Sequence, residues 1–313
     1  MEIGKILRLN GGIYTVEIGS ETVLCSAKGR FRHCDIVPTV GDEVEILREE
    51  GKSSEESGGV IASVLPRKNI LIRPPLANLD MIFVVASVKS PDPSLLALDK
   101  LLSVACHNGI RAVLVFTKKE LDPEGAEKLC DTYRKAGFSA EAVTCEDPEE
   151  IASLLIPYIK DRSVCALAGA SGVGKSTLIQ LLFPQIQTET GDLSEKTRRG
   201  RHTTRQSILY PIPLPKGRGS VYVADTPGFS LLDFDKFFFM EKEDLPLSFP
   251  EFRDRLGQCK YTKCSHRKED GCQILEAVRR GIIPQSRHDS YTALYEELSK
   301  TKSWELDKKR TRK

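Results

Sequence analysis

The sequence predicts a multi-domain protein with an N-terminal β-barrel, a central α/β domain and a mostly helical, metal-binding C-terminal domain. Three observations support this prediction. Short strand-like segments fill residues 1–65, apolar strands alternate with helical patterns across residues 66–232, and three cysteines cluster with a histidine within residues 233–313. A chain of 313 residues is long enough for two or three domains.

The composition is that of a folded, non-membrane protein. Hydrophobic residues make up 40% of the chain, and no apolar run approaches the roughly 20 residues that cross a bilayer. The first residues alternate polar and apolar side chains and lack the apolar core of a signal peptide. We therefore expect a cytoplasmic protein, and, because no coiled coil or dimer face is evident, a monomer. Six scattered cysteines are expected to be free thiols: Cys25, Cys34, Cys106, Cys130, Cys145 and Cys165.

Positive charge is concentrated in a few places. The net charge is only +2, which argues against a generally basic nucleic-acid binder. The stretch KTRRGRHTTR at 196–205 nevertheless has five basic residues and no acidic one, and the chain ends KKRTRK. These two segments are where a phosphate backbone would be met.

Residues 1–65 predict a small barrel. A Gly-Gly turn separates the apolar stretches of ILRLNGGIYTVEI, and ETVLCSAKGRF, GDEVEIL and GGVIASVLP follow at spacings typical of short strands. Five such strands suggest an OB-like barrel, although an SH3-like barrel would give the same sequence pattern.

A boundary follows, because PRKNILIRPPLANLD contains three prolines. Beyond it, apolar strands alternate with helical patterns, which predicts a parallel sheet covered on both faces. The expected strands include residues 79–87, 111–117 and 163–169, and the expected helices include 93–109 and 123–137. Past residue 232 the pattern breaks, and a final helix is expected over 286–305.

The strongest motif is a phosphate-binding loop that matches G-x-x-x-x-G-K-[ST], with an apolar strand before it and the helix-like LIQLLF after it. Its glycines let backbone amides wrap phosphates, and the helix N-terminus favours negative charge. Lys175 would reach the β- and γ-phosphates, and Ser176 would ligate Mg²⁺. The expected nucleotide contacts are Gly169, Ala170, Ser171, Gly172, Val173, Gly174, Lys175, Ser176 and Thr177.

A second motif, Asp225-Thr226-Pro227-Gly228, ends the strand SVYVAD. An acid at the carboxyl end of a strand near a phosphate-binding loop suits Mg²⁺ binding, and the Gly228 amide would lie near the γ-phosphate. Between the two motifs, the stretch GRHTT is where a Mg²⁺-sensing threonine is expected. Thr203 and Thr204 both fit, and we favour Thr204.

Guanine recognition usually needs N-K-x-D after a strand, and none follows Asp225. Upstream, RAVLVF leads into Thr117-Lys118-Lys119-Glu120, a degenerate form of that motif. Glu120 would accept N1–H and N2–H of guanine, and Lys118 would lie along the base plane. Thr144-Cys145 is a candidate for the loop that closes over the base. Since the base-reading motif precedes the phosphate-binding loop, the domain would be circularly permuted.

The cluster of Cys259, Cys264, His266 and Cys272 supplies three thiolates and one imidazole over a short stretch. This donor set matches a closed, structural zinc site rather than a catalytic one. His33, His107 and His288 are expected to be surface or packing residues.

These motifs together resemble the RsgA family (YjeQ or YloQ), circularly permuted GTPases that act on the bacterial small ribosomal subunit. The resemblance covers essentially the full length and rests on RPPLANLD, GASGVGKST, GRHTT, DTPGF and Cys-x₄-Cys-x-His-x₅-Cys. It implies an OB domain over 1–65, a permuted GTPase domain over 66–232 and a zinc domain over 233–313, with small-subunit rRNA as the partner. The sequence departs from the family at TKKE, which puts the tightness of guanine selection in doubt.

Hydrolysis is expected to be slow without a partner. Phe229 stands where Ras-like enzymes place a water-orienting glutamine, and it cannot orient water. His202, beside the threonines, is our candidate for that role, and its alternative is contact with RNA or solvent. Because DTPG leads directly into the last domain, we expect nucleotide-dependent movement to tilt that domain.

Three other functions remain open on the sequence. A P-loop ATPase or small-molecule kinase would suit weak base recognition at TKKE. A nonenzymatic RNA-binding module would require a vestigial phosphate-binding loop, against which the intact Lys175, Ser176 and Asp225 argue. A permuted GTPase of the large ribosomal subunit would share the central domain, but the barrel and the cysteine cluster favour the small subunit.

Overall fold

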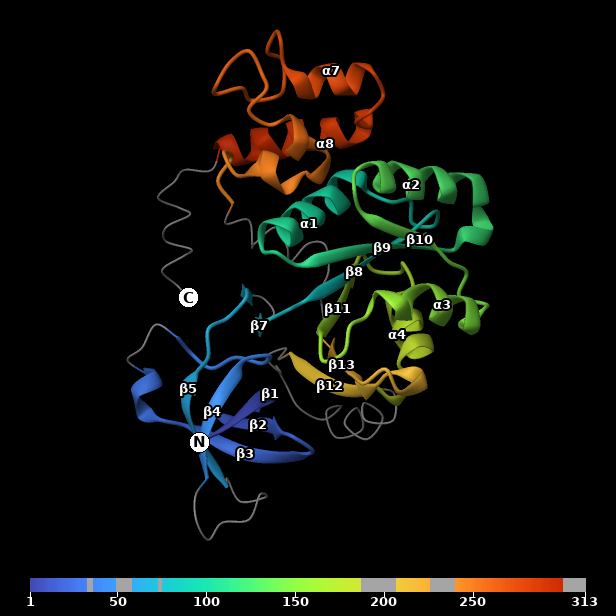
Figure 1. The fold of residues 1–313 in the computed structure, drawn as a ribbon. Helices are drawn as coiled ribbons and strands as arrows, with labels where there is room; N and C mark the ends of the chain where they lie inside the picture. The colour runs from blue at the N-terminus through green and yellow to red at the C-terminus, as the bar shows by residue number, and fades with distance from the viewer. Residues whose placement is uncertain (33–35, 49–57, 73–74, 187–206, 226–239, 301–313) are drawn as a thin grey trace.

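The N-terminal part of the chain forms a closed five-stranded barrel (Figure 1). The computed structural model describes residues 1–32, 36–48, 58–72, 75–186, 207–225 and 240–300. The sheet order β1-β2-β3-β5-β4, with β4 pairing back to β1, closes the barrel and fits the OB-like prediction. The elements are β1 (Glu2–Asn10), β2 (Ile13–Ile18), β3 (Glu21–Ala27), η1 (Gly29–Arg32), β4 (Glu43–Arg48) and β5 (Gly59–Val64).

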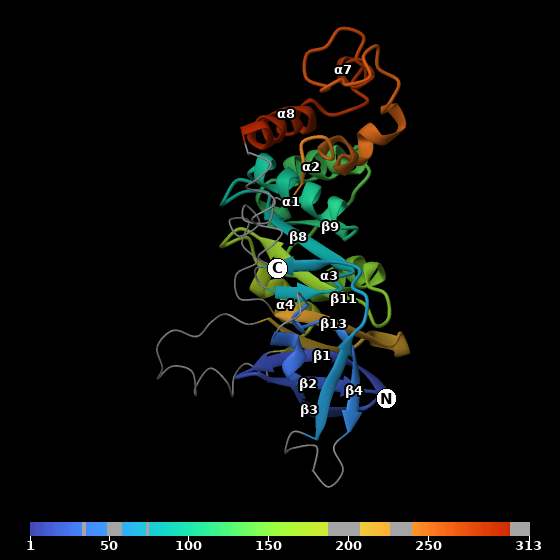
Figure 2. The ribbon, with the colours of Figure 1, turned by 90° about the vertical axis from the view of Figure 1, so that its left-hand side faces the viewer.

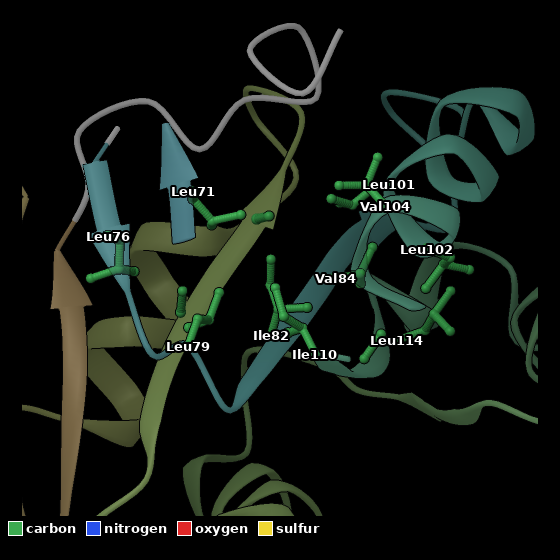
Figure 3. Packing of buried hydrophobic residues seen from close by; sticks show 14 of the residues in the cluster. Leu71, Leu76, Leu79, Ile82, Val84, Leu101, Leu102, Val104, Ile110 and Leu114 are labelled. Atoms are coloured by element: carbon green, nitrogen blue, oxygen red, sulfur yellow. The ribbon is translucent and has the colours of Figure 1, made fainter. Parts of the chain in front are cut away.

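The proline-rich boundary segment is a structured hairpin of β6 (Ile70–Ile72) and β7 (Pro75–Ala77). Leu71, Leu76 and Leu79 are buried here, in a core cluster that includes residues of the barrel and of the central sheet, and Figure 3 shows them beside the central sheet. The amide of Ala77 donates to the Val40 carbonyl of the barrel. A proline-rich boundary therefore fixes the barrel to the next domain.

The central domain contains the predicted parallel sheet, in the order β10-β9-β8-β11-β13. Its strands are β8 (Met81–Ser87), β9 (Arg111–Thr117), β10 (Ser139–Ala142), β11 (Val164–Gly169) and β13 (Ser220–Asp225). Alternate residues of β8 enter two separate cores, with Ile82 and Val84 on one face and Phe83 and Val85 on the other. Both faces are therefore buried, which explains the continuous apolar strands.

Helices cover both faces of this sheet. The helices α1 (Leu95–His107) and α2 (Pro123–Lys135) cover one face, and α3 (Pro148–Leu155) and α4 (Lys175–Leu182) cover the other. Figure 3 shows Leu101 and Val104 of α1 beside Val84. Asp122 and Asp147 cap α2 and α3 by accepting from the amides of Gly125 and Glu150, and a proline follows each cap. Short 3₁₀ turns are η2 (Lys119–Leu121), η3 (Ile156–Tyr158) and η4 (Pro215–Gly217).

Like β6 and β7, the strand β12 (Ile208–Pro213) was not predicted from the sequence. This strand runs antiparallel to β13 and pairs with β1 of the barrel at Arg8↔Ile208. It contains Pro211 and Pro213, which obscure a strand pattern. Through β12, the barrel and the central sheet form one eleven-stranded sheet. The sheet is therefore parallel only up to β13.

The C-terminal part packs against α1, on the far side of the central domain from the barrel (Figure 2). It contains η6 (Leu245–Ser248), η7 (Pro250–Arg255), α7 (Gln273–Arg279) and α8 (Gln285–Lys300). Phe249, Phe252 and Tyr291 form its aromatic core, with ring centroids about 5 Å apart. Across the described residues, no helix is both long and apolar enough to cross a membrane.

Candidate functional site

The predicted nucleotide motifs lie at one edge of the central sheet. Thr117 ends β9, Gly169 ends β11 and Asp225 ends β13, and β8 lies between β9 and β11. Because parallel strands end at the same edge, the phosphate-binding loop, the base-reading motif and the predicted Mg²⁺-binding acid are neighbours there. Circular permutation has changed the chain order of these motifs without changing their edge of the sheet.

The phosphate-binding loop is shaped by its glycines. Gly172 and Gly174 have φ values of +77° and +92°, in the left-handed region that favours glycine. A Cβ atom on Gly169 would lie 2.1 Å from the carbonyl oxygen of Val85, so only glycine fits where β11 meets β8. The loop ends at α4, whose first residue is Lys175 and whose second and third, Ser176 and Thr177, are exposed.

The ammonium group of Lys175 folds back over this loop. Its Nζ donates to the Ala170 carbonyl at 2.5 Å, and burial lowers the pKa of the Lys175 amine. The charge therefore lies at the mouth of the loop, where phosphates bind in other proteins with this motif.

Thr117 connects the base-reading motif to the phosphate-binding loop. Its side chain is fully buried, and its Oγ1 donates to the Val173 carbonyl at 2.6 Å. The Cα of Gly174 is also close, since a Cβ there would lie 3.7 Å from Thr117. The two motifs are 56 positions apart in the chain and in direct contact in the fold.

The rest of TKKE forms a tight turn. Lys118 adopts φ +58° and donates from Nζ to the Ser90 carbonyl, while Glu120 is exposed. Burial raises the pKa of the Cys145 thiol, the Glu120 charge raises it further and the Lys118 charge opposes this. Cys145 is therefore close to both side chains, as a loop closing over the base would be.

Sequence reasoning missed Glu150 at this site. Its Oε1 pairs with Lys119 Nζ at 2.7 Å, and the Lys119 amide donates to the Val143 carbonyl. These contacts hold the TKKE turn against the end of β10 and the start of α3. A glutamate in the first turn of a helix gives no sequence signal for this role.

Several predicted site residues lie outside the described residues. These are His202, Thr203 and Thr204 in the GRHTT stretch, together with Thr226, Pro227, Gly228 and Phe229. Cys34, His33, the basic stretch 196–205 and the KKRTRK tail are also outside. Asp225 is placed by its backbone, as the last residue of β13.

The four predicted metal ligands converge. The donor atoms of Cys259, Cys264, His266 and Cys272 all lie within 4.8 Å of one another. The Sγ atoms of Cys259 and Cys272 are 3.9 Å apart, and each lies 3.5 Å from His266 Nδ1. Tetrahedral zinc with bonds of roughly 2.3 Å to sulfur and 2.0 Å to nitrogen requires separations of about 3.8 and 3.5 Å. The residues present therefore fit a tetrahedral metal ion.

The loop that carries the ligands is held by buried side chains. His288 lies 2.8 Å from the His266 carbonyl through Nε2, and Tyr291 donates to the Ser265 carbonyl at 3.0 Å. Burial opposes ionisation of Glu269, but hydrogen bonds from Ser265 and from nearby backbone amides outweigh it and hold the Glu269 pKa at about 2. His288 is thus a packing residue, as predicted, while His107 is exposed.

The remaining cysteines lie away from the metal site. Cys25, Cys130 and Cys165 are buried free thiols, and Cys106 and Cys145 are half-buried free thiols. Burial raises the pKa of Cys25 and Cys130 to about 11, so these thiols stay protonated near neutral pH.

The fold and this edge of the sheet define a class: a P-loop nucleotide-binding protein whose base-reading segment precedes the phosphate-binding loop, in circularly permuted order. The chain matches the family model for the RsgA GTPase over residues 64–235 and that for the RsgA N-terminal domain over residues 3–55. The chain belongs to the RsgA GTPase family, and it is a GTPase by that membership.

Similar proteins span nearly the whole chain. A small ribosomal subunit biogenesis GTPase RsgA from Caldanaerobacter subterraneus is 40% identical over 299 residues, covering 94% of this chain and 95% of the relative. One from Carboxydothermus hydrogenoformans is 40% identical over 296 residues, covering 95% and 97%.

Two solved structures share the fold. The crystal structure of YjeQ from Thermotoga maritima has a TM-score of 0.78 and 31% identity, covering 96% of this chain and 99% of that one. The structure of YloQ, described as a circularly permuted GTPase, has a TM-score of 0.75 and 32% identity, covering 96% of both chains. The predicted fold class and family resemblance are therefore confirmed.

Proposed function

We propose that this chain is a ribosome-stimulated GTPase that hydrolyses GTP to GDP and phosphate during late maturation of the small ribosomal subunit, whose rRNA it binds. The observation that carries the proposal is the hydrogen bond from Thr117 to Val173, which joins the base-reading segment to the phosphate-binding loop at one sheet edge. The relatives described above as small ribosomal subunit biogenesis GTPases support the same partner.

At the nucleotide site, the TKKE turn (Thr117, Lys118, Lys119 and Glu120) contacts the base and residues 169–177 surround the phosphates. Lys175 would contact the β- and γ-phosphates, and Ser176, Asp225 and Thr204 would hold Mg²⁺. Mg²⁺, when bound, would neutralise negative charge on the phosphate oxygens. The Gly228 amide lies near the γ-phosphate in this proposal. The Lys175 position at the mouth of the loop supports the assignment.

Hydrolysis also needs an oriented water molecule. Phe229 has no polar atom for this purpose, so His202 is the proposed orienting group, and the ribosomal subunit arranges it. Slow turnover of the free protein follows from this arrangement.

The metal bound by the Cys₃His cluster is proposed to be zinc in a structural role. The donor set and its spacing support zinc, and four protein ligands leave no open coordination position. We further propose three functional units, residues 1–65, 66–232 and 233–313, in a monomer that works in the cytoplasm.

The test is nucleotide hydrolysis by the purified, full-length protein, with and without purified small ribosomal subunits. We expect slow GTP hydrolysis that the subunits stimulate strongly and little use of ATP. Equal hydrolysis of ATP would show that TKKE does not select guanine and would favour an ATPase. Stimulation by large but not by small ribosomal subunits would show that the proposed partner is wrong.

A further inference from the structure

A cavity of about 440 Å³ opens at the edge of the central sheet opposite to the nucleotide site. It is lined by residues that precede or begin strands: Asp80 before β8, Arg111 at the start of β9 and Ser163 before β11. The turn from Tyr158 to Arg162 and the side chain of Lys68 complete it. A strand of seven residues such as β8 spans roughly 20 Å, so the cavity is well separated from the phosphate-binding loop.

The two acidic residues of this cavity have structural partners. Asp80 accepts from the Val164 amide at 2.9 Å through Oδ2 and from Lys68 Nζ at 2.8 Å through Oδ1. Asp161 accepts from the Ser220 amide at 2.8 Å. Both carboxylates therefore accept hydrogen bonds from neighbouring backbone amides. Among the cations of this cavity, Lys68 forms an ion pair, with Asp80.

The other three cations are not neutralised. Arg111 lies over the Tyr158 ring, 5.4 Å from its centroid, and donates to the Tyr158 carbonyl at 3.1 Å. The Arg162 guanidinium donates to the Tyr222 hydroxyl at 3.4 Å, and Lys160 is exposed. Within the described residues, none of these three side chains forms an ion pair. The cavity thus has four cations against two carboxylates, beside the Tyr158 ring that the Arg111 guanidinium covers.

We propose that this cavity binds phosphate groups of an RNA strand, at a site distinct from the nucleotide site. Arginine and lysine without carboxylate partners are the usual phosphate contacts, and the Arg111 guanidinium and the Tyr158 ring offer flat surfaces to an adjacent nucleotide. An RNA strand fits better than a small anion, because the cations Lys160 and Arg162 are exposed rather than enclosed. The proposal rests on the proposed function, since the RNA is that of the small ribosomal subunit.

The test compares two double variants of the full-length, metal-loaded protein. K160Q with R162Q removes two cavity charges, while K128Q with K135Q removes two exposed charges from α2 and serves as the matched control. Binding to purified small ribosomal subunits is measured with a non-hydrolysable GTP analogue between low and moderate salt. Both variants must retain the unfolding temperature and basal GTP hydrolysis of the unsubstituted protein.

The cavity variant is expected to bind about tenfold more weakly, with the slope of log K against log salt reduced in magnitude by about 1–2, since each lost phosphate contact removes roughly 0.7–0.9. The control variant should keep both values. Equal losses in the two variants, or none in the cavity variant, would overturn the site while subunit-stimulated hydrolysis still supports the proposed function. Failure of the unsubstituted protein to bind subunits would remove both proposals.

A small-anion ligand is distinguished by calorimetry with pyrophosphate, using protein already saturated with the GTP analogue. Stoichiometric pyrophosphate binding that the cavity variant loses, combined with unchanged subunit affinity, would assign the cavity to a free anion and refute the RNA proposal. Absence of pyrophosphate binding together with weakened subunit binding is the expected result.

Discussion

The barrel and the C-terminal domain are joined to the central domain by different kinds of contact. The C-terminal junction is made of buried side chains: Arg287 of α8 is 1% exposed and pairs with Asp99 of α1 at 2.5 Å and with Glu251 at 2.7 Å. The barrel junction combines backbone pairing of β1 with β12 and side-chain contacts of the boundary segment, in which Arg67 pairs with the buried Asp42 at 2.7 Å.

The difference teaches that chain order does not reveal which domain adjoins the nucleotide switches. The C-terminal domain follows DTPG in sequence, yet its main described contacts are with α1, together with Tyr133 of α2 and Phe138. The barrel comes first in sequence, yet it pairs with β12, the strand after the predicted switch stretch. A tilt of the C-terminal domain would have to break the buried Arg287 contacts, so we expect the barrel to respond more readily to the nucleotide.

The largest expected effect is that of metal removal on the C-terminal domain. The Cys₃His cluster adjoins α7, which starts directly after Cys272, and metal binding contributes about 10–16 kcal/mol to the folding of small zinc peptides. Chelation should abolish amide protection in residues 259–279, measured by hydrogen exchange. Amides of the barrel in the same sample are the control, and their equal loss would show that the two junctions are not independent.

Replacement of Arg287 by methionine should be the next most damaging change. It leaves two carboxylates buried without their cation, which costs about 3–5 kcal/mol in the free energy of unfolding. The substitution also removes the contact of the guanidinium with the Phe249 ring, whose centre lies 4.5 Å from Cζ of Arg287. Denaturant unfolding measures the loss, and R279M on the exposed surface of α7 is the control. A cost below about 1 kcal/mol would mean that this junction is no stronger than a surface pair.

Substitution of Gly41 by alanine tests the barrel junction. Gly41 has φ +91°, and a Cβ atom there would lie 2.2 Å from the Ala77 carbonyl oxygen of the hairpin. The matched control is G12A, because Gly12 has φ +85° and open space around its Cβ position. Backbone strain alone costs about 1–3 kcal/mol in both variants. G41A should therefore be clearly less stable than G12A in denaturant unfolding. Equal free energies of unfolding would indicate that the hairpin moves away from Gly41 at little cost.

The smallest expected effect is that of Y222F at the same junction. Tyr222 of β13 donates its hydroxyl proton to Glu17 of the barrel, and such a hydrogen bond contributes about 0.5–1.5 kcal/mol. We expect a loss within that range, together with unchanged GTP hydrolysis. Y14F, inside the barrel, provides the comparison. A loss as large as that of R287M would reverse the ranking of the two junctions.

The sequence was sufficient for elements that have a local signal. The glycines and lysine of the phosphate-binding loop, the cysteine spacing and the alternating strands of the barrel each determine their structure through nearby residues. The strands and helices of the central domain were also predicted, because both-face burial makes the strands continuously apolar and Asp-Pro pairs mark where α2 and α3 begin.

The missed features depend on contacts between distant residues. β12 has prolines in its sequence and forms only because β13 and β1 flank it. Arg287 lies in a polar helix that predicts a solvated side chain, and only the packing of α8 on α1 buries it. Glu150 and the cationic cavity likewise arise from tertiary contacts that no single segment encodes.

The hydrogen bond of Thr117 limits what this residue can offer a purine. A threonine hydroxyl has one proton, and Thr117 gives it to the Val173 carbonyl, so toward a bound base it can only accept. An asparagine would have a second amide proton for an acceptor such as N7 of guanine. With the nucleotide bound as proposed, the imidazole side of the base would therefore receive no donor from Thr117. Because guanine and adenine both carry N7, this would weaken purine binding in general, and selection of guanine is assigned in our proposal to the carboxylate of Glu120.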